Sequence, residues 1–156
     1  MPGWSPLHAH VHQTLRSLAH ASTGEAAAQL LPSQDSLLVA VSGGQDSQCL
    51  LRLLVDLREK WQWSLHAVHC NHRWRADADD NARFVMQVAE QWGIACTVIT
   101  ADSPPISEAA ARHWRYDRFE AVARAQRAER GLAAGGAHGI GDVGVAGRVG
   151  DVLDER

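Results

Sequence analysis

Residues 36–47 read SLLVAVSGGQDS, an apolar run that passes directly into a short stretch of serine, glycine and aspartate. The run from Ser36 to Val41 has the length and β-branched content of a buried strand. Beyond it, apolar residues recur at helical spacing, which predicts a helix from Asp46 to Trp61. This part of the chain therefore predicts a strand, a tight loop and a helix in immediate succession.

The same alternation continues along the chain. Ser64 to His69 and Ile94 to Thr100 are apolar runs that predict two further buried strands. Helices are expected from Ala76 to Trp92 and from Ser107 to Arg130, the second capped by the Ser107 hydroxyl. Strands that alternate with helices of this length predict an α/β fold with a doubly wound, Rossmann-like parallel sheet.

The first two of these helices carry an apolar stripe that should face the sheet. The stripes comprise Cys49, Leu50, Leu53, Leu54 and Leu57 in one helix and Phe84, Val85, Val88 and Ala89 in the other. The cysteines, Cys49, Cys70 and Cys96, lack the C-x-x-C spacing of zinc and iron–sulfur sites. We expect all three to be buried, reduced thiols.

The loop between the first strand and its helix, residues 42–47, predicts an anion site. Backbone N–H groups and a helix N-terminus converge there, and glycines allow a phosphate to approach the backbone closely. The hydroxyls of Ser42 and Ser47 add hydrogen-bond donors. A carboxylate beside phosphates is repulsive unless a cation lies between them, so Asp46 is assigned to Mg²⁺. The alternative is an ordinary strand-to-helix turn capped by Asp46 or Ser47.

The S-G-G-x-D-S pattern of this loop resembles that of the ATP-pyrophosphatase loop family. Members of that family cleave ATP to AMP and pyrophosphate and adenylate an oxygen of their substrate. The resemblance implies ATP and Mg²⁺ as ligands of the chain. Their contacts would come from Ser42, Gly43, Gly44, Gln45, Asp46 and Ser47. No G-K-[ST] follows, so the loop is not a Walker A loop.

Two further stretches narrow the resemblance to tRNA(Ile)-lysidine synthetases. Residues 68–75, VHCNHRWR, resemble their V-x-x-x-H-x-L-R segment, with Arg73 and Trp74 where glycine and leucine are usual. A later helix resembles their E-x-x-A-R-x-x-R-Y segment through Glu108, Ala111, Arg112, Arg115 and Tyr116. The resemblance implies that His72 binds the nucleotide and that Asp46, Arg112 and Arg115 are catalytic.

The activity that this resemblance implies is ATP-dependent tRNA modification by a ligase. Free lysine would be joined to the wobble cytidine of the tRNA(Ile) anticodon through an adenylated intermediate. Two alternatives stay open. Another adenylating enzyme of the superfamily, such as a tRNA thiolase, would need suitably paired cysteines. A non-catalytic ATP-binding module of the universal-stress type would carry its glycine signature late in the chain.

Charge and hydropathy limit the partners of the chain. A formal net charge of -3 opposes RNA binding by bulk electrostatics, so any RNA contact must come from a local patch. Lys60 is the only lysine, and arginine supplies the remaining positive charge. The start of the chain lacks a signal-peptide pattern, and no apolar run approaches the roughly 20 residues of a membrane span. We expect no membrane contact and a cytoplasmic location.

Composition divides the chain into three parts. Residues 1–35 are expected to form an N-terminal helix, from about Leu7 to Leu18, and a linker. The resemblance to the ATP-pyrophosphatase loop family covers residues 36–130, which implies that they form the nucleotide-binding domain, in truncated form. Residues 131–156 hold eight of the thirteen glycines and no aromatic residue, which predicts a disordered tail. The chain is expected to be a truncated form of a longer synthetase.

A shift of reading frame is our hypothesis for the tail. The residues from Gly136 to Gly141 can be encoded GGG GCA CAC GGC ATC GGN. Read from the second nucleotide, these codons give G-H-T-A-S, which resembles the segment with which the synthetases continue. The glycines of the tail would then be accidents of GC-rich codons.

Overall fold

The computed structural model describes residues 4–21 and 34–134. The elements within them are α1 (Pro6–Ala21), β1 (Ser36–Ala40), α2 (Gln45–Trp61), β2 (Ser64–Asn71), α3 (Ala78–Gln91), β3 (Ala95–Thr100) and α4 (Glu108–Ala134). Among these elements, no helix has the length and apolar character that crossing a membrane requires.

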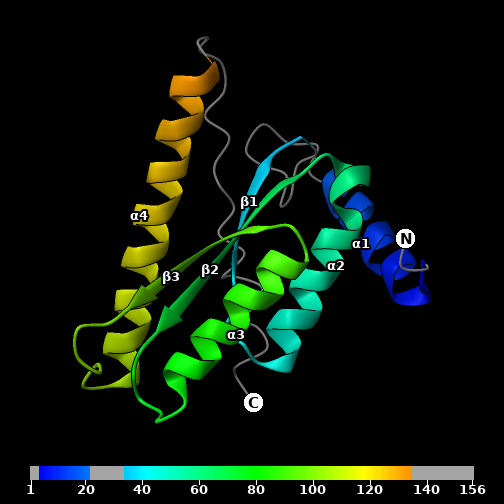
Figure 1. Ribbon diagram of the computed structural model, residues 1–156. Helices are drawn as coiled ribbons and strands as arrows, with labels where there is room; N and C mark the ends of the chain where they lie inside the picture. The colour runs from blue at the N-terminus through cyan, green and yellow to red at the C-terminus, as the bar shows by residue number, and fades with distance from the viewer. Residues whose placement is uncertain (1–3, 22–33, 135–156) are drawn as a thin grey trace.

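The three strands form a parallel sheet in the order β1-β2-β3. Ser36 pairs with Ser64 at the start of β1, and Asn71 pairs with Thr100 at the end of β2. Helices α2 and α3 cover one face of the sheet and α4 covers the other (Figure 1). The predicted α/β class and doubly wound parallel arrangement are therefore confirmed.

Each predicted strand and helix is present, with ends that differ by a few residues. Strand β2 continues to Asn71, beyond the predicted end at His69, because it stays paired with β3 as far as Thr100. Helix α4 begins after Ser107, whose Oγ accepts a hydrogen bond from the Ala110 N–H at 3.1 Å, as a helix cap does. It continues to Ala134, four residues beyond its predicted end. The rest of the predicted tail, residues 135–156, lies outside the described residues.

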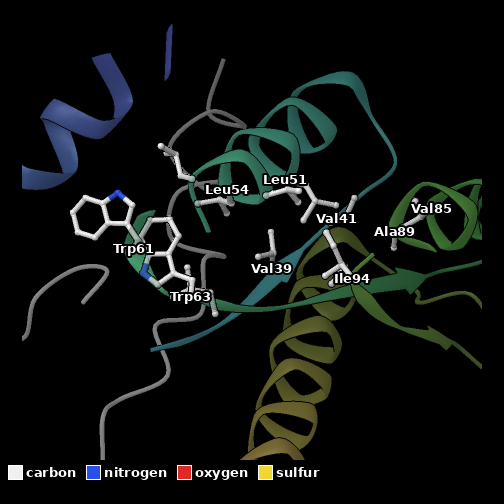
Figure 2. Packing of buried hydrophobic residues seen from close by; sticks show 13 residues of the cluster. Val39, Val41, Leu51, Leu54, Trp61, Trp63, Val85, Ala89 and Ile94 are labelled. Carbon is white, nitrogen blue, oxygen red and sulfur yellow. The ribbon is translucent and has the colours of Figure 1, made fainter. Parts of the chain in front are cut away.

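Alternate residues of β1 divide the core between the two faces of the sheet. Leu37 and Val39 pack with residues of α2 and α3 in one cluster, parts of which Figure 2 shows. Leu38 packs with Val68 and Phe119 in a second cluster beneath α4. The strand is thus buried on both faces, which explains its continuous apolar sequence.

The predicted apolar stripes of α2 and α3 each included a residue that does not face the sheet. Helix α2 buries Leu51 and Leu54, whereas Cys49 is exposed. At about 100° per residue, a position two residues before Leu51 lies on the opposite side of the helix. Phe84 of α3 is likewise 44% exposed, because Val85 faces the sheet instead. The prediction that all three cysteines are buried is wrong at Cys49, and Cys70 and Cys96 are only partly buried.

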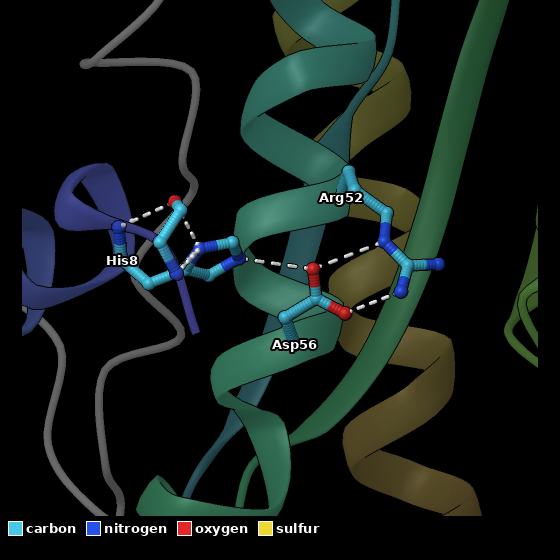
Figure 3. A network of polar contacts seen from close by, with 4 residues as sticks. His8, Arg52 and Asp56 are labelled. Carbon is cyan, nitrogen blue, oxygen red and sulfur yellow. Dashed lines mark hydrogen bonds and ion pairs between the residues drawn. The ribbon is translucent and has the colours of Figure 1, made fainter. Parts of the chain in front are cut away.

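Helix α1 packs on α2 through polar as well as apolar contacts. The His8 ring contacts Asp56 at 3.0 Å between Nε2 and Oδ2, and Asp56 also accepts a hydrogen bond from Arg52 Nε at 3.0 Å (Figure 3). One turn further along α1, His12 Nδ1 accepts a hydrogen bond from the Trp61 indole at 3.1 Å. These contacts fix α1 at the side of α2 and away from the loop at residues 42–44.

Candidate functional site

The loop after β1 is closed by hydrogen bonds among its own residues. Ser42 Oγ lies 3.0 Å from Ser47 Oγ and accepts a hydrogen bond from the Gly44 N–H at 3.2 Å. Ser47 Oγ donates in turn to the Gly44 carbonyl at 2.9 Å. Gly44 is the N-cap of α2, so the first N–H groups of the helix follow directly. The loop therefore presents two hydroxyls and a helix N-terminus at one point, as an anion site requires.

Gly43 occupies a position that requires glycine. Its φ of +89° lies in the left-handed region, and a Cβ built there would stand 2.1 Å from Asn81 Oδ1. Asn81 comes from the first turn of α3, and its Nδ2 donates to the Ser42 carbonyl at 2.8 Å. The side chain thus braces the loop from a separate helix. Sequence reasoning missed Asn81, because no local pattern shows that α3 begins beside this loop.

The loop lines a cavity of about 930 Å³ at the carboxyl edge of the sheet. That volume lies at the upper end of the roughly 300–1,000 Å³ typical of small-molecule sites. The other walls come from the ends of β1 and β2, the segment after β2 and one face of α4. All six loop residues, together with His72 and Arg115, line it; Arg112 is not among the described residues that do. Parallel strands end at one edge, which is why these distant segments meet.

Asp46 lies exposed in the first turn of α2 and lines the cavity. Within the described part of the chain, no side chain donates to its carboxylate or forms an ion pair with it. No set of three histidine, cysteine or acidic side chains that could hold a metal occurs among these residues. The donor set nevertheless fits Mg²⁺, because Mg²⁺ is commonly held by one or two carboxylates together with phosphate oxygens and water.

The end of β2 is held in place by buried polar groups. His69 Nδ1 donates to the Val41 carbonyl at 2.7 Å, which ties β2 to the start of the loop. Burial lowers the pKa of His69, and the hydrogen bond to Val41 opposes that shift only in part. The buried Asn71 donates to Asp79 Oδ1 at 2.7 Å and accepts from the Arg73 N–H at 2.9 Å. His69 therefore ties the end of β2 to the residue that follows β1, and Asn71 holds the segment that follows β2 against α3.

Arg73 stands where the resemblance leads one to expect glycine, and the backbone shows why glycine is usual. Its φ is +59°, in the left-handed region that disfavours side chains with a Cβ. The departure from the pattern keeps the backbone conformation and adds an exposed guanidinium.

His72 is half-buried between two tryptophan rings. Its ring stacks on Trp74 with centroids 5.5 Å apart and meets Trp114 edge to face at 5.1 Å. Its Nδ1 is buried and has no hydrogen-bond partner among the described residues. Burial and the neighbouring Arg115 lower the pKa of His72, so the ring is neutral near pH 7. Sequence reasoning selected His72 but missed both tryptophans.

Helix α4 places its two predicted catalytic arginines differently. Arg115 lines the cavity and lies 3.4 Å from Glu108, measured between a guanidinium nitrogen and Oε1. Arg112 is exposed, and its guanidinium lies over the Tyr116 ring, 5.6 Å from the centroid. Tyr116 and the buried Phe119 pack toward the sheet. The geometry thus brings Arg115, but not Arg112, together with the loop residues.

Cys70 is the cysteine that lines the cavity, and it is a poor nucleophile. Burial raises the pKa of its thiol to about 11, and the opposing effect of Arg115 and Arg118 is smaller. The reactive form of cysteine is the thiolate. At neutral pH this thiol is protonated, which does not suit a carrier of sulfur.

A strand, a glycine-bearing loop and a helix that converge on one cavity are the features of a nucleotide-binding α/β domain. The PP-loop domain family matches residues 8–138, and the chain belongs to that family.

The chain is also similar to curated proteins named tRNA(Ile)-lysidine synthase. The protein from Thermosynechococcus vestitus is 52% identical over 122 residues, and that from Nostoc sp. is 48% identical over 122 residues. Each match covers 78% of this chain and 33% of the relative, so the chain spans about a third of the length of these relatives. The protein from Gloeobacter violaceus is 50% identical over 101 residues, covering 65% of this chain and 31% of its own length.

Among solved structures, the U34-tRNA thiolase NcsA from Methanococcus maripaludis superposes with a TM-score of 0.43 at 17% identity. The superposition covers 60% of this chain and 30% of that chain. This likeness is too weak to bear on function.

Proposed function

We propose that this chain is the ATP-binding part of a tRNA(Ile)-lysidine synthetase. The observation that carries the proposal is the loop at residues 42–47. The braced loop backbone, its two hydroxyls and the exposed Asp46 carboxylate line one cavity, which His72 and Arg115 also line. Curated relatives of that name, 48–52% identical over 122 residues, support the substrate class.

The proposed reaction has two steps. The C2 carbonyl oxygen of the wobble cytidine attacks the α-phosphorus of ATP, and the bond to pyrophosphate breaks. The amine of free lysine then attacks C2, the bond to the adenylyl oxygen breaks, and AMP leaves. No covalent enzyme intermediate is required, so no protein nucleophile is needed at the cavity.

The chain's own residues contribute by positioning and by charge. Loop N–H groups and the hydroxyls of Ser42 and Ser47 would hold the phosphates of ATP in line for attack. Arg115 would stabilise the negative charge that develops at the α-phosphate. Mg²⁺, held at Asp46, would neutralise charge on the phosphate oxygens. The cytoplasmic location expected from the sequence is part of the same proposal.

The thiolase alternative is disfavoured by the state of the cysteines. Cys70 is a protonated thiol at neutral pH, and Cys49 is exposed on α2 and does not line the cavity. A universal-stress type of ATP-binding module would account for ATP binding without catalysis. The reaction itself therefore has to be tested.

A chimera tests the proposed activity in a full-length context. Residues 36–130 would replace the matching segment of the Thermosynechococcus vestitus protein, and pyrophosphate release would be measured with ATP, lysine and a tRNA(Ile) transcript. We expect release that depends on both lysine and the tRNA, and none from the same chimera with Asp46→Ala. A folded chimera that binds ATP but releases no pyrophosphate would refute the proposed activity. The non-catalytic ATP-binding module would then be the remaining alternative.

The two arginines of α4 form a matched pair in the same assay. Arg115→Gln should lower pyrophosphate release at least tenfold, because Arg115 lines the cavity. Arg112→Gln, one turn away and directed at Tyr116, should have a smaller effect. Equal losses from the two variants would return Arg112 to the catalytic role that the sequence predicts for it.

A further inference from the structure

The exposed edge of the cavity carries an aromatic cluster for which the proposed chemistry at the α-phosphate has no role. It consists of His72, Trp74 and Trp114, drawn from the segment after β2 and from α4. The Trp74 indole N–H donates to the Pro105 carbonyl at 2.9 Å, which fixes the ring against the loop before α4. A tryptophan at this place departs from the leucine that the resemblance leads one to expect.

The Trp74 ring is covered in part by His72, and the residue remains partly exposed. The ring stacks on His72 with an angle of 29° between their planes, yet Trp74 as a whole remains 46% exposed. His72 packs between the two indoles, and its buried Nδ1 has no hydrogen-bond partner among the described residues. The result is an aromatic surface at the cavity that is anchored by a hydrogen bond and remains partly exposed. Exposed, rigid aromatic rings of this kind bind unpaired nucleic-acid bases by stacking.

Of the two arginines beside the cluster, one is placed to contact an RNA phosphate. Arg75 is engaged by Asp77 through two hydrogen bonds of 2.8 and 2.7 Å, so its charge is largely compensated. Arg73 is exposed, and within the described residues its guanidinium donates a 3.4 Å hydrogen bond to the Asp102 carbonyl, not to a carboxylate. A guanidinium next to an open ring is the combination with which proteins bind single-stranded RNA.

We propose that Trp74, supported by His72 and Trp114, is a stacking platform for an unpaired base of the RNA substrate, with Arg73 contacting a neighbouring phosphate. This inference rests on the proposed function, because it places the RNA of that reaction at the edge of the same cavity. It concerns an unpaired base because a base within a duplex offers no free face for stacking.

Fluorescence anisotropy with the full chain tests the platform. The probes are a labelled anticodon stem-loop RNA and a labelled RNA duplex with the same number of phosphates. The unchanged chain should bind the stem-loop more tightly than the duplex. Trp74→Leu should weaken stem-loop binding about tenfold and leave duplex binding unchanged, whereas Arg73→Gln should weaken both.

Matched variants separate stacking from a general loss of structure. Trp74→Phe keeps an aromatic face and should bind the stem-loop within about threefold of the unchanged chain. Trp4→Leu removes a tryptophan of similar exposure, 51%, from the start of the chain, where it contacts Lys60 of α2, and should have no effect. Equal stem-loop affinities of Trp74→Leu and Trp4→Leu would overturn the inference.

Calorimetry with ATP distinguishes failure of the platform from failure of the proposed function. Although Trp74 lines the cavity, we expect Trp74→Leu to keep ATP binding, because leucine is the residue that the resemblance leads one to expect at this position. If Trp74→Leu loses affinity for both ATP and RNA, the base that stacks on Trp74 is the adenine of ATP. That result refutes the RNA platform, while ATP binding by the unchanged chain still supports the proposed function. If the unchanged chain binds ATP but not the stem-loop, the platform is again refuted. If it binds neither ligand, the proposed function fails as well.

Discussion

Gly43→Ala is the substitution for which the structure makes the sharpest prediction. The residue has a φ of +89°, and its missing Cβ would lie 2.1 Å from Asn81 Oδ1 and 2.7 Å from Asn81 Cγ and Nδ2. An alanine therefore cannot enter unless the backbone of the loop or the Asn81 side chain moves. Either movement disturbs the site at its centre.

The cost has two parts. Holding an L-residue in the left-handed region costs about 1–2 kcal/mol. Rotating Asn81 away breaks its 2.8 Å hydrogen bond to the Ser42 carbonyl, which contributes about 0.5–1.5 kcal/mol. We expect Gly43→Ala to lower the free energy of unfolding by about 1.5–3.5 kcal/mol and to abolish ATP binding.

Urea unfolding of the chain, followed by circular dichroism, measures the first effect, and calorimetry measures the second. The matched control is Gly44→Ala, because Gly44 has an ordinary φ of -73° and its nearest neighbour to a Cβ would be Ser42 Oγ at 3.4 Å. That control should lose less than about 1 kcal/mol. Adding Asn81→Ala to Gly43→Ala should recover part of the loss. Equal destabilisation by the two alanines would refute this account of the loop.

Three further predictions concern other parts of the chain. Arg73→Gly should raise the free energy of unfolding by about 0.5–1 kcal/mol in urea titrations, because relief of left-handed strain in the folded chain exceeds the entropy that glycine adds to the unfolded chain. A lower free energy of unfolding would show that the Arg73 side chain contributes more to stability than its exposure indicates. Burial lowers the pKa of His69 below its ordinary 6.5, so the unfolded chain binds more protons and the free energy of unfolding should fall as the pH drops below about 6.5. His69→Gln should make this pH dependence shallower, and an unchanged dependence would show that other histidines cause it. In the gene, the +1 frame beyond Arg130 should encode a segment resembling G-H-T-A-S, and an immediate stop codon in that frame would end the frameshift hypothesis.

The fold was predictable because each layer leaves a separate mark on the sequence. A strand buried on both faces, such as β1, is an uninterrupted apolar run, and a helix on a sheet has a periodic stripe. The phase of a stripe is harder to predict when a helix carries apolar residues on more than one side. Cys49 and Phe84 were misplaced for that reason, since both sit beside residues that do face the sheet.

The loop of the candidate site was predictable from its own residues, whereas His72 and Arg115 were selected only through the family resemblance. Residues 42–47 form a single local unit, so their convergence on one cavity follows from the strand, the loop and the helix. Asn81, Trp74 and Trp114 reach the site from other segments, and their positions depend on how α3 and α4 pack on the sheet. The sequence likewise treated Arg112 and Arg115 alike, because helical spacing does not show which one lines the cavity.

Calorimetric titration with Mg·ATP tests most directly whether the loop at residues 42–47 is the ATP site. The comparison is among the unchanged chain, Asp46→Ala and Glu59→Ala, which removes an exposed acid from the far end of the same helix. We predict that the unchanged chain and Glu59→Ala bind Mg·ATP alike, and that Asp46→Ala binds it at least tenfold more weakly. Equal affinity of all three proteins for Mg·ATP would contradict the assignment.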